Sequence, residues 1–430
     1  MEEGSMVILK NGTIIDPKTN YMGKKDVAVE CGIITKVAEE IEVSENDTVY
    51  DCAGKYIAPG LVDVHVHFRD PGFTYKEDIE SGSKAAAKGG FTSVILMANV
   101  KPAVDNEETI QYILDKGKQT GIHVYTCANV TKGMKGQELN DFAKLLDAGA
   151  IGFTDDGVPL LEEELVYNAM EAAVKTNSVL SFHEEDPQYI TNNGINRGRA
   201  SEYFGIGGSD RQAEISMVQR DLQLALKTGA KVNFQHLSTK EAVEMIREAK
   251  KNPNGQNIHA EATPHHIALT EEAAMEHGTL GKMNPPLREE KDRQAIISAL
   301  QDGTIDLIAT DHAPHTKEEK DKAITEAPSG ILGLETAFAI VNEELILNGK
   351  MDYLQLFCKI SLNPAELYGL EAGNLAEGKV ADLVVFDAER EWKVEQFLSK
   401  SQNSPFRNKK LKGKIELTMC DGKIVYEDLL

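Results

Sequence analysis

The middle of the chain alternates short apolar runs with longer amphipathic stretches. Amphipathic segments such as Leu161–Thr176 and Asp210–Thr228 have the apolar spacing of helices. Between such segments, runs rich in β-branched and apolar residues predict strands, namely Leu61–His67, Ser93–Ala98, Val124–Val130, Ala150–Asp155, Val179–Glu184, Lys231–His236, Ile258–His265 and Ile305–His312. Near-continuous apolar strands are typical of a parallel sheet whose outer face is covered. This alternation therefore predicts an α/β fold, a (β/α)8 TIM barrel, over residues 58–372.

The two ends of the chain have a different pattern, with short apolar segments separated by turn residues. Asn11-Gly12 and Asp421-Gly422 stand between such segments, and both dipeptides favour two-residue hairpin turns. Neither end has enough strands to form a stable domain alone. We therefore expect residues 1–57 and 373–430 to pair into one small composite β-sandwich, with the barrel inserted between them.

Composition narrows the class of protein. The chain has 46 Lys and Arg against 69 Asp and Glu, a formal net charge of −23, which argues against nucleic acid as a partner. No apolar run approaches the roughly 18 residues that a membrane helix needs. The first residues are acidic and lack the pattern of a secretion signal. The 5 cysteines are scattered, without C-x-x-C spacing. We expect a cytoplasmic protein with neither a membrane partner nor a disulfide framework.

The strongest local signal is a pair of histidines in the first predicted barrel strand. His65 and His67 are two residues apart, so their side chains project from the same face of the strand, while Val64 and Val66 are expected to face the surrounding helices. Two adjacent imidazoles at the carboxyl end of a barrel strand make half of a zinc site. The alternative is a pair of buried, hydrogen-bonded structural histidines.

Further candidate ligands stand at corresponding strand ends. His183, His236 and Asp311 end the fifth, sixth and eighth predicted strands. With the first pair they exceed what one catalytic zinc needs, so we expect two metal ions about 3.5–4 Å apart. Such a pair needs a bridging carboxylate, and either Asp155 or Asp156 could supply it, because strand alternation alone does not decide between them.

Three other histidines are expected to be structural. His265 and His266 are neighbours, and adjacent strand residues point to opposite faces, so at most one could reach the site. We expect both to make structural hydrogen bonds. His312 follows Asp311 directly and is expected to lie behind the ligands rather than among them.

Longer motifs resemble a known family. Asp63–Arg69 followed by Asp70-Pro71-Gly72, and the later segments Met283–Arg288 and Ala309–His315, resemble the signatures of dihydroorotases among the cyclic amidohydrolases. Thr154–Gly157 resembles the long-chain bacterial type, in which an aspartate bridges the metals. The resemblance implies reversible, zinc-dependent cyclisation of N-carbamoyl-L-aspartate to dihydroorotate, in pyrimidine biosynthesis. It also implies a homodimer and association with aspartate transcarbamoylase.

The resemblance assigns roles to individual residues. One zinc would be held by His65, His67 and Asp311 and the other by His183 and His236, with Asp156 as the bridge. Asp311 would also be the catalytic base and then acid. Arg69 can grip a carboxylate with its planar fork. The substrate-binding set implied is His67, Arg69, Asn99, Asn284, His315, Ser329 and Gly330.

Two departures from the family pattern and two competing interpretations stay open. Met97–Val100 lacks the proline common in relatives, and Ser329 stands where many relatives have an aromatic residue. The nearest alternative is a hydantoinase or allantoinase, although the Asp156 bridge and the spacing of His67 and Arg69 argue against it. A non-catalytic barrel scaffold is the other alternative.

Overall fold

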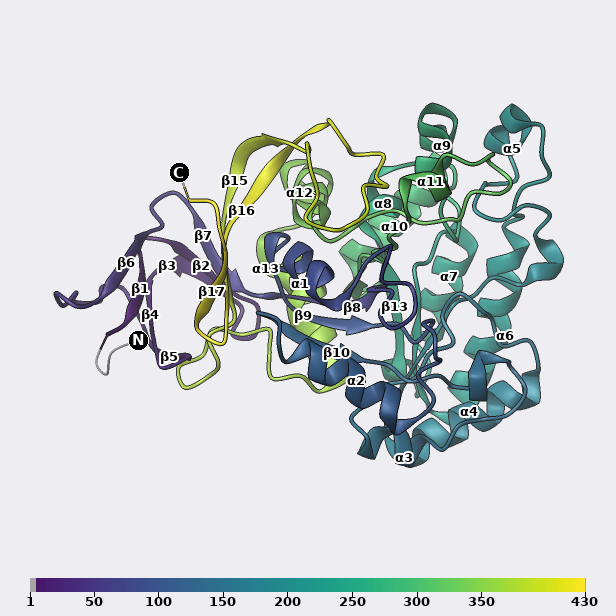
Figure 1. The fold of residues 1–430 in the computed structure, drawn as a ribbon, viewed down its shortest axis with the longest axis horizontal. Helices are drawn as coiled ribbons and strands as arrows, with labels where there is room; N and C mark the ends of the chain where they lie inside the picture. The colour runs from purple at the N-terminus through teal and green to yellow at the C-terminus, as the bar shows by residue number, and fades with distance from the viewer. Residues whose placement is uncertain (1–4, 430) are drawn as a thin grey trace.

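The barrel strands lie in the right half of Figure 1, surrounded by helices. The computed structural model describes residues 5–429, so Met1–Gly4, part of the N-terminal segment considered above, lie outside it. The parallel strands are β8 (Leu61–Val66), β9 (Phe91–Leu96), β10 (His123–Thr126), β11 (Val179–Phe182), β12 (Lys231–Phe234), β13 (Ile258–Ala262) and β14 (Leu307–Ile308). They form a sheet in the order β10-β9-β8 and a second in the order β11-β12-β13-β14.

Single bridges, rather than continuous ladders, join these two sheets into the barrel. Phe153 bridges to Ala128 on one side and Leu180 on the other, and Val66 bridges to His312. The strand predicted over Ala150–Asp155 is therefore reduced to one bridging residue. Its end is drawn into a turn, because the Asp155 carboxylate accepts a hydrogen bond from the backbone N–H of Val130 at 2.9 Å. Such side-chain bonds compete with sheet pairing.

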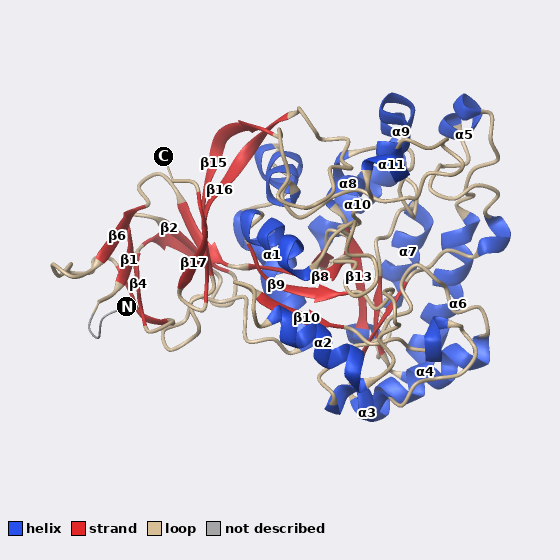
Figure 2. Ribbon diagram, viewed as in Figure 1, coloured by secondary structure: helices blue, strands red, loops and turns tan. Residues whose placement is uncertain are grey.

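Helices cover the outside of the barrel strands (Figure 2). The longer ones are α1 (Ile79–Lys88), α2 (Glu107–Gly117), α4 (Glu163–Thr176), α6 (Gln212–Thr228), α7 (Lys240–Ala249) and α10 (Glu290–Asp302). Several begin at a capping side chain: Asp78, Asn106 and Thr239 each accept from a backbone N–H of the first turn. The shorter ones are α3 (Phe142–Asp147), α5 (Arg199–Phe204), α8 (Pro264–Ala268), α9 (Glu272–His277), α11 (Lys317–Lys320), α12 (Ala337–Val341), α13 (Tyr353–Phe357) and α14 (Asn363–Tyr368). Within residues 5–429, none of the helices is long and apolar enough to cross a bilayer.

The chain ends share a sheet, at the left of Figure 1. One sheet has the order β5-β4-β1-β6, and the other has the order β17-β16-β15-β7-β2-β3. The N-terminal strands are β1 (Val7–Lys10), β2 (Thr13–Asp16), β3 (Tyr21–Lys24), β4 (Asp26–Glu30), β5 (Ile33–Ala38), β6 (Thr48–Asp51) and β7 (Tyr56–Pro59). The C-terminal strands are β15 (Leu383–Lys393), β16 (Lys410–Cys420) and β17 (Lys423–Glu427). β7 pairs antiparallel with β15, so strands more than 300 residues apart lie side by side.

Only one of the two expected hairpins forms. Asp421 and Gly422 both have positive φ and join the antiparallel strands β16 and β17. The prediction for Asn11-Gly12 is wrong, because β1 and β2 belong to different sheets. Gly12 is instead needed for close packing: a Cβ there would lie 2.6 Å from the side chain of Ile57.

The first barrel strand contains a register shift between Asp63 and Val66. Val66 belongs to the main core, which includes apolar residues of the covering helices. Val64 belongs instead to a separate small cluster with Ile95, Leu307 and Tyr368, the last residue of α14. A bulge of this kind adds one residue to a strand and changes which face the following side chains occupy.

Candidate metal centre and substrate cleft

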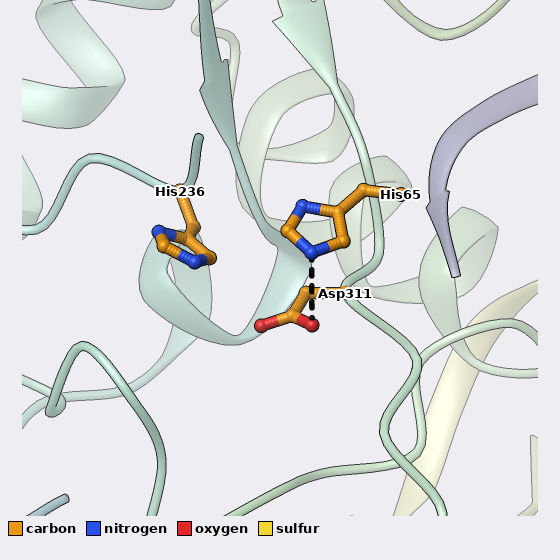
Figure 3. Close-up of side chains that lie close together, drawn as sticks. All are labelled: His65, His236 and Asp311. Atoms are coloured by element: carbon orange, nitrogen blue, oxygen red, sulfur yellow. Dashed lines mark ion pairs between the residues drawn. The ribbon is translucent and has the colours of Figure 1, made fainter. Parts of the chain in front are cut away.

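The side chains expected to bind metal come together at the carboxyl ends of the barrel strands. Asp311 Oδ1 lies 2.9 Å from His67 Nε2 and 3.3 Å from His65 Nε2. Figure 3 shows His65, His236 and Asp311 converging on one point, with the ion pair between His65 and Asp311 dashed. On the other side of the cluster, His183 Nδ1 lies 3.1 Å from His236 Nε2. The structure thus places four histidines and one aspartate in one cluster.

Asp156 lies between the two sets of histidines. Its Oδ1 is 3.4 Å from His65 Nε2 and 3.7 Å from His183 Nδ1, and its Oδ2 is 3.3 Å from His67 Nε2. Burial alone would raise the pKa of Asp156, but the facing imidazoles of His65 and His67 hold it well below the ordinary value. One ionised carboxylate therefore faces both halves of the cluster.

Asp155, the alternative bridge, has a different role. Its carboxylate accepts from Asn129 Nδ2 at 3.2 Å, from the Thr131 hydroxyl and from the Val130 backbone N–H. These bonds use its oxygens to hold a loop. Of the two neighbouring aspartates, only Asp156 lies among the histidines.

The buried polar atoms of this cluster fit a metal ion. His65 Nε2 and Asp156 Oδ1 are buried and have no hydrogen-bond partner among the described residues, an arrangement that is costly unless a ligand satisfies both. Three overlapping groups of potential ligands have their atoms within 4.8 Å of one another: His65, His67 and Asp156; Asp156, His183 and His236; and His65, His236 and Asp311. Imidazole nitrogens and carboxylate oxygens are donors that zinc accepts.

Two of these residues have strained backbones. His236 has φ of 29° and Asp311 has φ of 48°, in the left-handed region that non-glycine residues rarely adopt. Such conformations persist only where the surroundings impose them, and they concentrate at functional sites. Burial and the neighbouring His183 hold the pKa of His236 well below its ordinary value, so its imidazole is neutral and free to bind a cation.

Carboxylates behind the histidines fix their orientation, and the sequence interpretation missed them. His65 Nδ1 lies 2.9 Å from Glu261 Oε2, and His183 Nε2 lies 3.1 Å from Glu185 Oε2. Such partners hold the imidazole of a metal ligand in one tautomer and raise its basicity. Glu261 could have been noticed, since a lone carboxylate inside the apolar segment Ile258–Ala262 needs a buried partner.

A cleft of about 190 Å³ opens onto the cluster. Its lining includes every residue predicted to bind substrate except Gly330: His67, Arg69, Asn99, Asn284, His315 and Ser329. Asn284 Oδ1 and Ser329 Oγ are buried without a partner among the described residues, so they can bond to a polar ligand. Gly330 lies just behind this lining, where a Cβ would come within 2.6 Å of the Ala313 carbonyl oxygen.

His315 and Arg69 are fixed on one side of the cleft. His315 Nε2 donates to the Ser329 carbonyl oxygen at 2.9 Å, and its Nδ1 accepts from Lys76 Nζ at 3.2 Å. Arg69 Nε donates to the Pro314 carbonyl oxygen at 3.3 Å. Burial and the nearby Arg69 lower the pKa of His315, so that its ring is neutral. Arg69 Nη2 also lies 3.3 Å from His315 Nε2, and this guanidinium is the main positive group of the cleft lining.

A C-terminal segment supports this side of the cleft, and sequence reasoning missed it. Asn403 Nδ2 donates to the carbonyl oxygens of Ala313 and Gly330 at 2.9 and 3.0 Å, and its Oδ1 accepts from the His315 backbone N–H at 3.0 Å. The buried Lys320 adds a bond from Nζ to the Pro328 carbonyl oxygen at 2.8 Å. Nothing in the local sequence of Asn403 indicates a contact almost 90 residues away.

The histidines expected to be structural are outside the metal cluster. His266 bonds to Thr263 Oγ1 at 2.7 Å and to the Pro285 carbonyl oxygen at 3.1 Å. His312 Nδ1 accepts from the Gly333 backbone N–H at 3.2 Å. His265 differs from the expectation, because its buried Nε2 has no hydrogen-bond partner among the described residues. Burial and His266 keep the pKa of His265 well below its ordinary value, which avoids an unpaired buried charge.

Comparison with known proteins agrees with this geometry. Residues 56–425 match the model of the amidohydrolase family. A dihydroorotase of Clostridioides difficile strain 630 is 52% identical over 421 residues, covering 98% of this chain and 100% of that protein. The chain belongs to the amidohydrolase family, among its dihydroorotases. A dihydroorotase of Clostridium acetobutylicum is 47% identical over 425 residues, again covering 98% of this chain and 100% of the relative.

Solved structures share the same fold. An L-hydantoinase from Arthrobacter aurescens has a TM-score of 0.86 and 26% identity, covering 98% of this chain and 96% of the other. A D-hydantoinase has a TM-score of 0.85 at 22% identity, with 98% and 95% covered. These similarities identify the fold as a TIM barrel with a β-sandwich, as predicted.

Proposed function

We propose a two-zinc hydrolytic mechanism for this chain, which functions as a dihydroorotase. The reaction interconverts N-carbamoyl-L-aspartate and dihydroorotate, with water lost on cyclisation. Full-length similarity to several dihydroorotases supports the function. The observation that carries the mechanism is the position of Asp156, whose two oxygens face histidines on both sides.

The proposed metal ligands divide into two sets that share the bridge. His65, His67 and Asp311 would hold one ion, His183 and His236 the other, and Asp156 both. When bound, such a pair of ions supplies a strongly acidified water molecule and polarises a carbonyl group. The partnerless buried atoms of His65 and Asp156 support this assignment.

Asp311 is the proposed proton carrier. Its carboxylate reaches the cleft beside His67, at 2.9 Å, and its strained backbone fixes that position. In hydrolysis it would accept a proton from the attacking water and then deliver it to the departing ring nitrogen. In cyclisation the same oxygen would carry the proton in the opposite direction, as reversibility requires.

Polar groups of the cleft are the proposed substrate ligands. Arg69 can bind the substrate carboxylate through paired N–H groups, a geometry that matches guanidinium to carboxylate. Asn99, Asn284, Ser329 and Gly330 would fix the polar edges of the ring through side-chain or backbone groups. His67 and His315 complete the set, with His315 held in position by Lys76 and Ser329.

A substrate panel tests this proposal. Purified protein is assayed with dihydroorotate, hydantoin and allantoin, beside Asp311→Ala, and bound zinc is counted. We expect turnover of dihydroorotate alone, zinc in the catalytic cluster, and a loss on the order of 10²- to 10⁴-fold in the variant. Turnover of hydantoin or allantoin instead would overturn the assignment of dihydroorotate as the substrate. An inactive, metal-free wild type would indicate a non-catalytic scaffold.

Four further expectations belong to the proposal. The chain is divided into a composite sandwich of residues 1–57 and 373–430 and a barrel of residues 58–372, which the strand pairing of β7 with β15 supports. Family resemblance supports a cytoplasmic location, a homodimer and association with aspartate transcarbamoylase. Size-exclusion chromatography with and without that partner tests the assembly.

A further inference from the structure

A second group of metal-binding side chains lies where the barrel meets the C-terminal sheet. His123 begins β10, Asp382 precedes β15, and Cys420 and Asp421 stand at the turn between β16 and β17. His123 Nε2 lies 2.9 Å from Asp382 Oδ2 and 3.7 Å from Asp421 Oδ1. The ligand atoms of His123, Cys420 and Asp421 all lie within 4.8 Å of one another.

The spacing of these atoms resembles that of the catalytic cluster. There, the imidazole-to-carboxylate distances involving Asp156 and Asp311 run from 2.9 to 3.7 Å, the same two values as at His123. A thiol, an imidazole and carboxylates form the mixed sulfur, nitrogen and oxygen set that tetrahedral zinc accepts. The chemistry and the separation of the donors therefore fit one ion.

The charge balance also favours a cation. Asp382 and Asp421 both face His123, so two carboxylates share one imidazole. The Asp421 backbone N–H donates to Asp382 Oδ1 at 2.9 Å, which holds the two acidic residues together. Even with His123 protonated, the group keeps one negative charge in excess, before any ionisation of the thiol.

The group is open to solvent from one side. A cleft of about 340 Å³ is lined by His123, Cys420 and Asp421. The Asp421 side chain is 60% exposed, whereas Cys420 is buried beneath it. The Cys420 Sγ lies 3.7 Å from the Thr92 carbonyl oxygen. The buried Cys420 therefore lines a cleft that is open to solvent.

We propose that His123, Asp382, Cys420 and Asp421 form a site for one zinc ion, separate from the catalytic centre. His123 is at the amino end of β10, and the catalytic ligands are at the carboxyl ends of the strands, on the opposite face of the barrel. The ion ties the barrel strand β10 to the hairpin of β16 and β17. Binding displaces one proton from the Cys420 thiol to solvent, and a second from His123 where it is protonated.

Cobalt substitution gives a direct test, because only a thiolate ligand produces a sulfur-to-cobalt charge-transfer band in the near ultraviolet. The assigned catalytic ligands are histidine and aspartate, so their cobalt complex lacks that band. The full-length protein is stripped of metal, titrated with Co²⁺ and compared with Cys420→Ser, His123→Gln and Asp421→Asn. Cys127→Ser is the matched control, as Cys127 is also buried but outside the group.

We expect the band in the wild type and in Cys127→Ser, its loss in Cys420→Ser, and at least about 10-fold weaker cobalt binding in His123→Gln and Asp421→Asn. Absence of the band once the catalytic cluster is loaded with cobalt would overturn the proposal, as would a band unchanged in Cys420→Ser. If Cys420→Ser does not fold, unchanged binding in both other variants also overturns it. Dihydroorotate turnover is measured in parallel, so failure of this site and failure of the proposed function are distinguishable.

Discussion

The metal cluster and the substrate side of the cleft are neighbours that are built in different ways. The cluster gathers side chains from the ends of barrel strands, and two of its buried atoms, His65 Nε2 and Asp156 Oδ1, have no hydrogen-bond partner among the described residues. On the substrate side, His315 has protein partners for both ring nitrogens, and Asn403 and Lys320 hold the adjoining loops. The cluster leaves buried atoms open to a bound ion. On the substrate side, protein hydrogen bonds hold the supporting groups, and Asn284 Oδ1 and Ser329 Oγ are left open to a polar ligand.

Substitutions in the two regions are therefore expected to have different consequences. A change in the cluster should remove metal and activity while the fold survives. A change in the supporting hydrogen bonds should alter substrate binding, because it moves groups that the substrate touches, while the metal stays bound.

The largest effect is expected from Asp156→Asn, which weakens both halves of the cluster. We expect loss of bound metal and a fall in kcat of roughly 10³-fold, because metal polarisation contributes several kcal/mol to the transition state. Metal analysis and steady-state kinetics measure both. The adjacent Asp155→Asn is the matched control. It should keep its metal but lower Tm, since Asp155 holds the Val130 loop; equal metal loss in both variants would contradict the assignment of the bridge.

Arg69→Lys tests the substrate side directly. Lysine keeps the charge but loses the planar pair of donors. We expect kcat/KM for dihydroorotate to fall roughly 10- to 100-fold, because this is the loss that corresponds to a hydrogen bond with a charged group. The effect should appear mainly in KM, with the metal content unchanged. An unaltered KM would show that Arg69 does not bind the substrate carboxylate.

Asn403→Ala tests the support of the cleft from the C-terminal segment. Removing the side chain leaves the carbonyl groups of Ala313 and Gly330 and the N–H of His315 without this partner. We expect KM to rise about 10-fold, from roughly 1–3 kcal/mol of lost hydrogen bonding, without loss of metal. Gln396→Ala, at an exposed position of the same segment, should leave KM unchanged. A normal KM and a normal Tm in Asn403→Ala would show that Asn403 does not support the substrate side of the cleft.

The smallest effect is a pH dependence of stability. Burial and the neighbouring Lys282 lower the pKa of Lys320 to about 7, against 10.5 for an ordinary lysine. Between these values the unfolded chain binds a proton that the folded chain does not, so this lysine makes stability rise with pH above about 7. We expect the free energy of unfolding of the wild type, relative to Lys320→Met, to increase from pH 6 to pH 9 by on the order of 1 kcal/mol. Denaturant titrations at both pH values measure it, and the exposed Lys317→Met should show no such change.

Strand alternation and strand ends were sufficient to predict which side chains gather in the cluster, but not what surrounds them. His65, His67, His183, His236 and Asp311 follow apolar strands, and the barrel brings those strand ends together. The choice of Asp156 over Asp155 needed the family resemblance, because it depends on a turn in which Asp155 bonds to the Val130 N–H.

Other features depend on contacts that are distant in the sequence. The register shift beside Val64, which packs in a different cluster from Val66, arises from pairing with β9. The absence of a hairpin at Asn11 follows from the placement of β1 and β2 in different sheets. The Asn403 side chain donates to the carbonyl oxygen of Ala313, 90 residues earlier in the sequence. No local pattern carries this information, because each contact is fixed only when the barrel and the terminal sheets pack together.

Anomalous X-ray diffraction at the zinc edge, on crystals of the zinc-loaded protein, is the most direct test of two metal ions bridged by Asp156. We expect two strong peaks on either side of Asp156, one beside His65, His67 and Asp311 and the other beside His183 and His236. A peak at Cys420 would concern only the separate site at the barrel junction. No peak at the catalytic cluster, or a single ion that Asp156 does not touch, would contradict the two-metal mechanism.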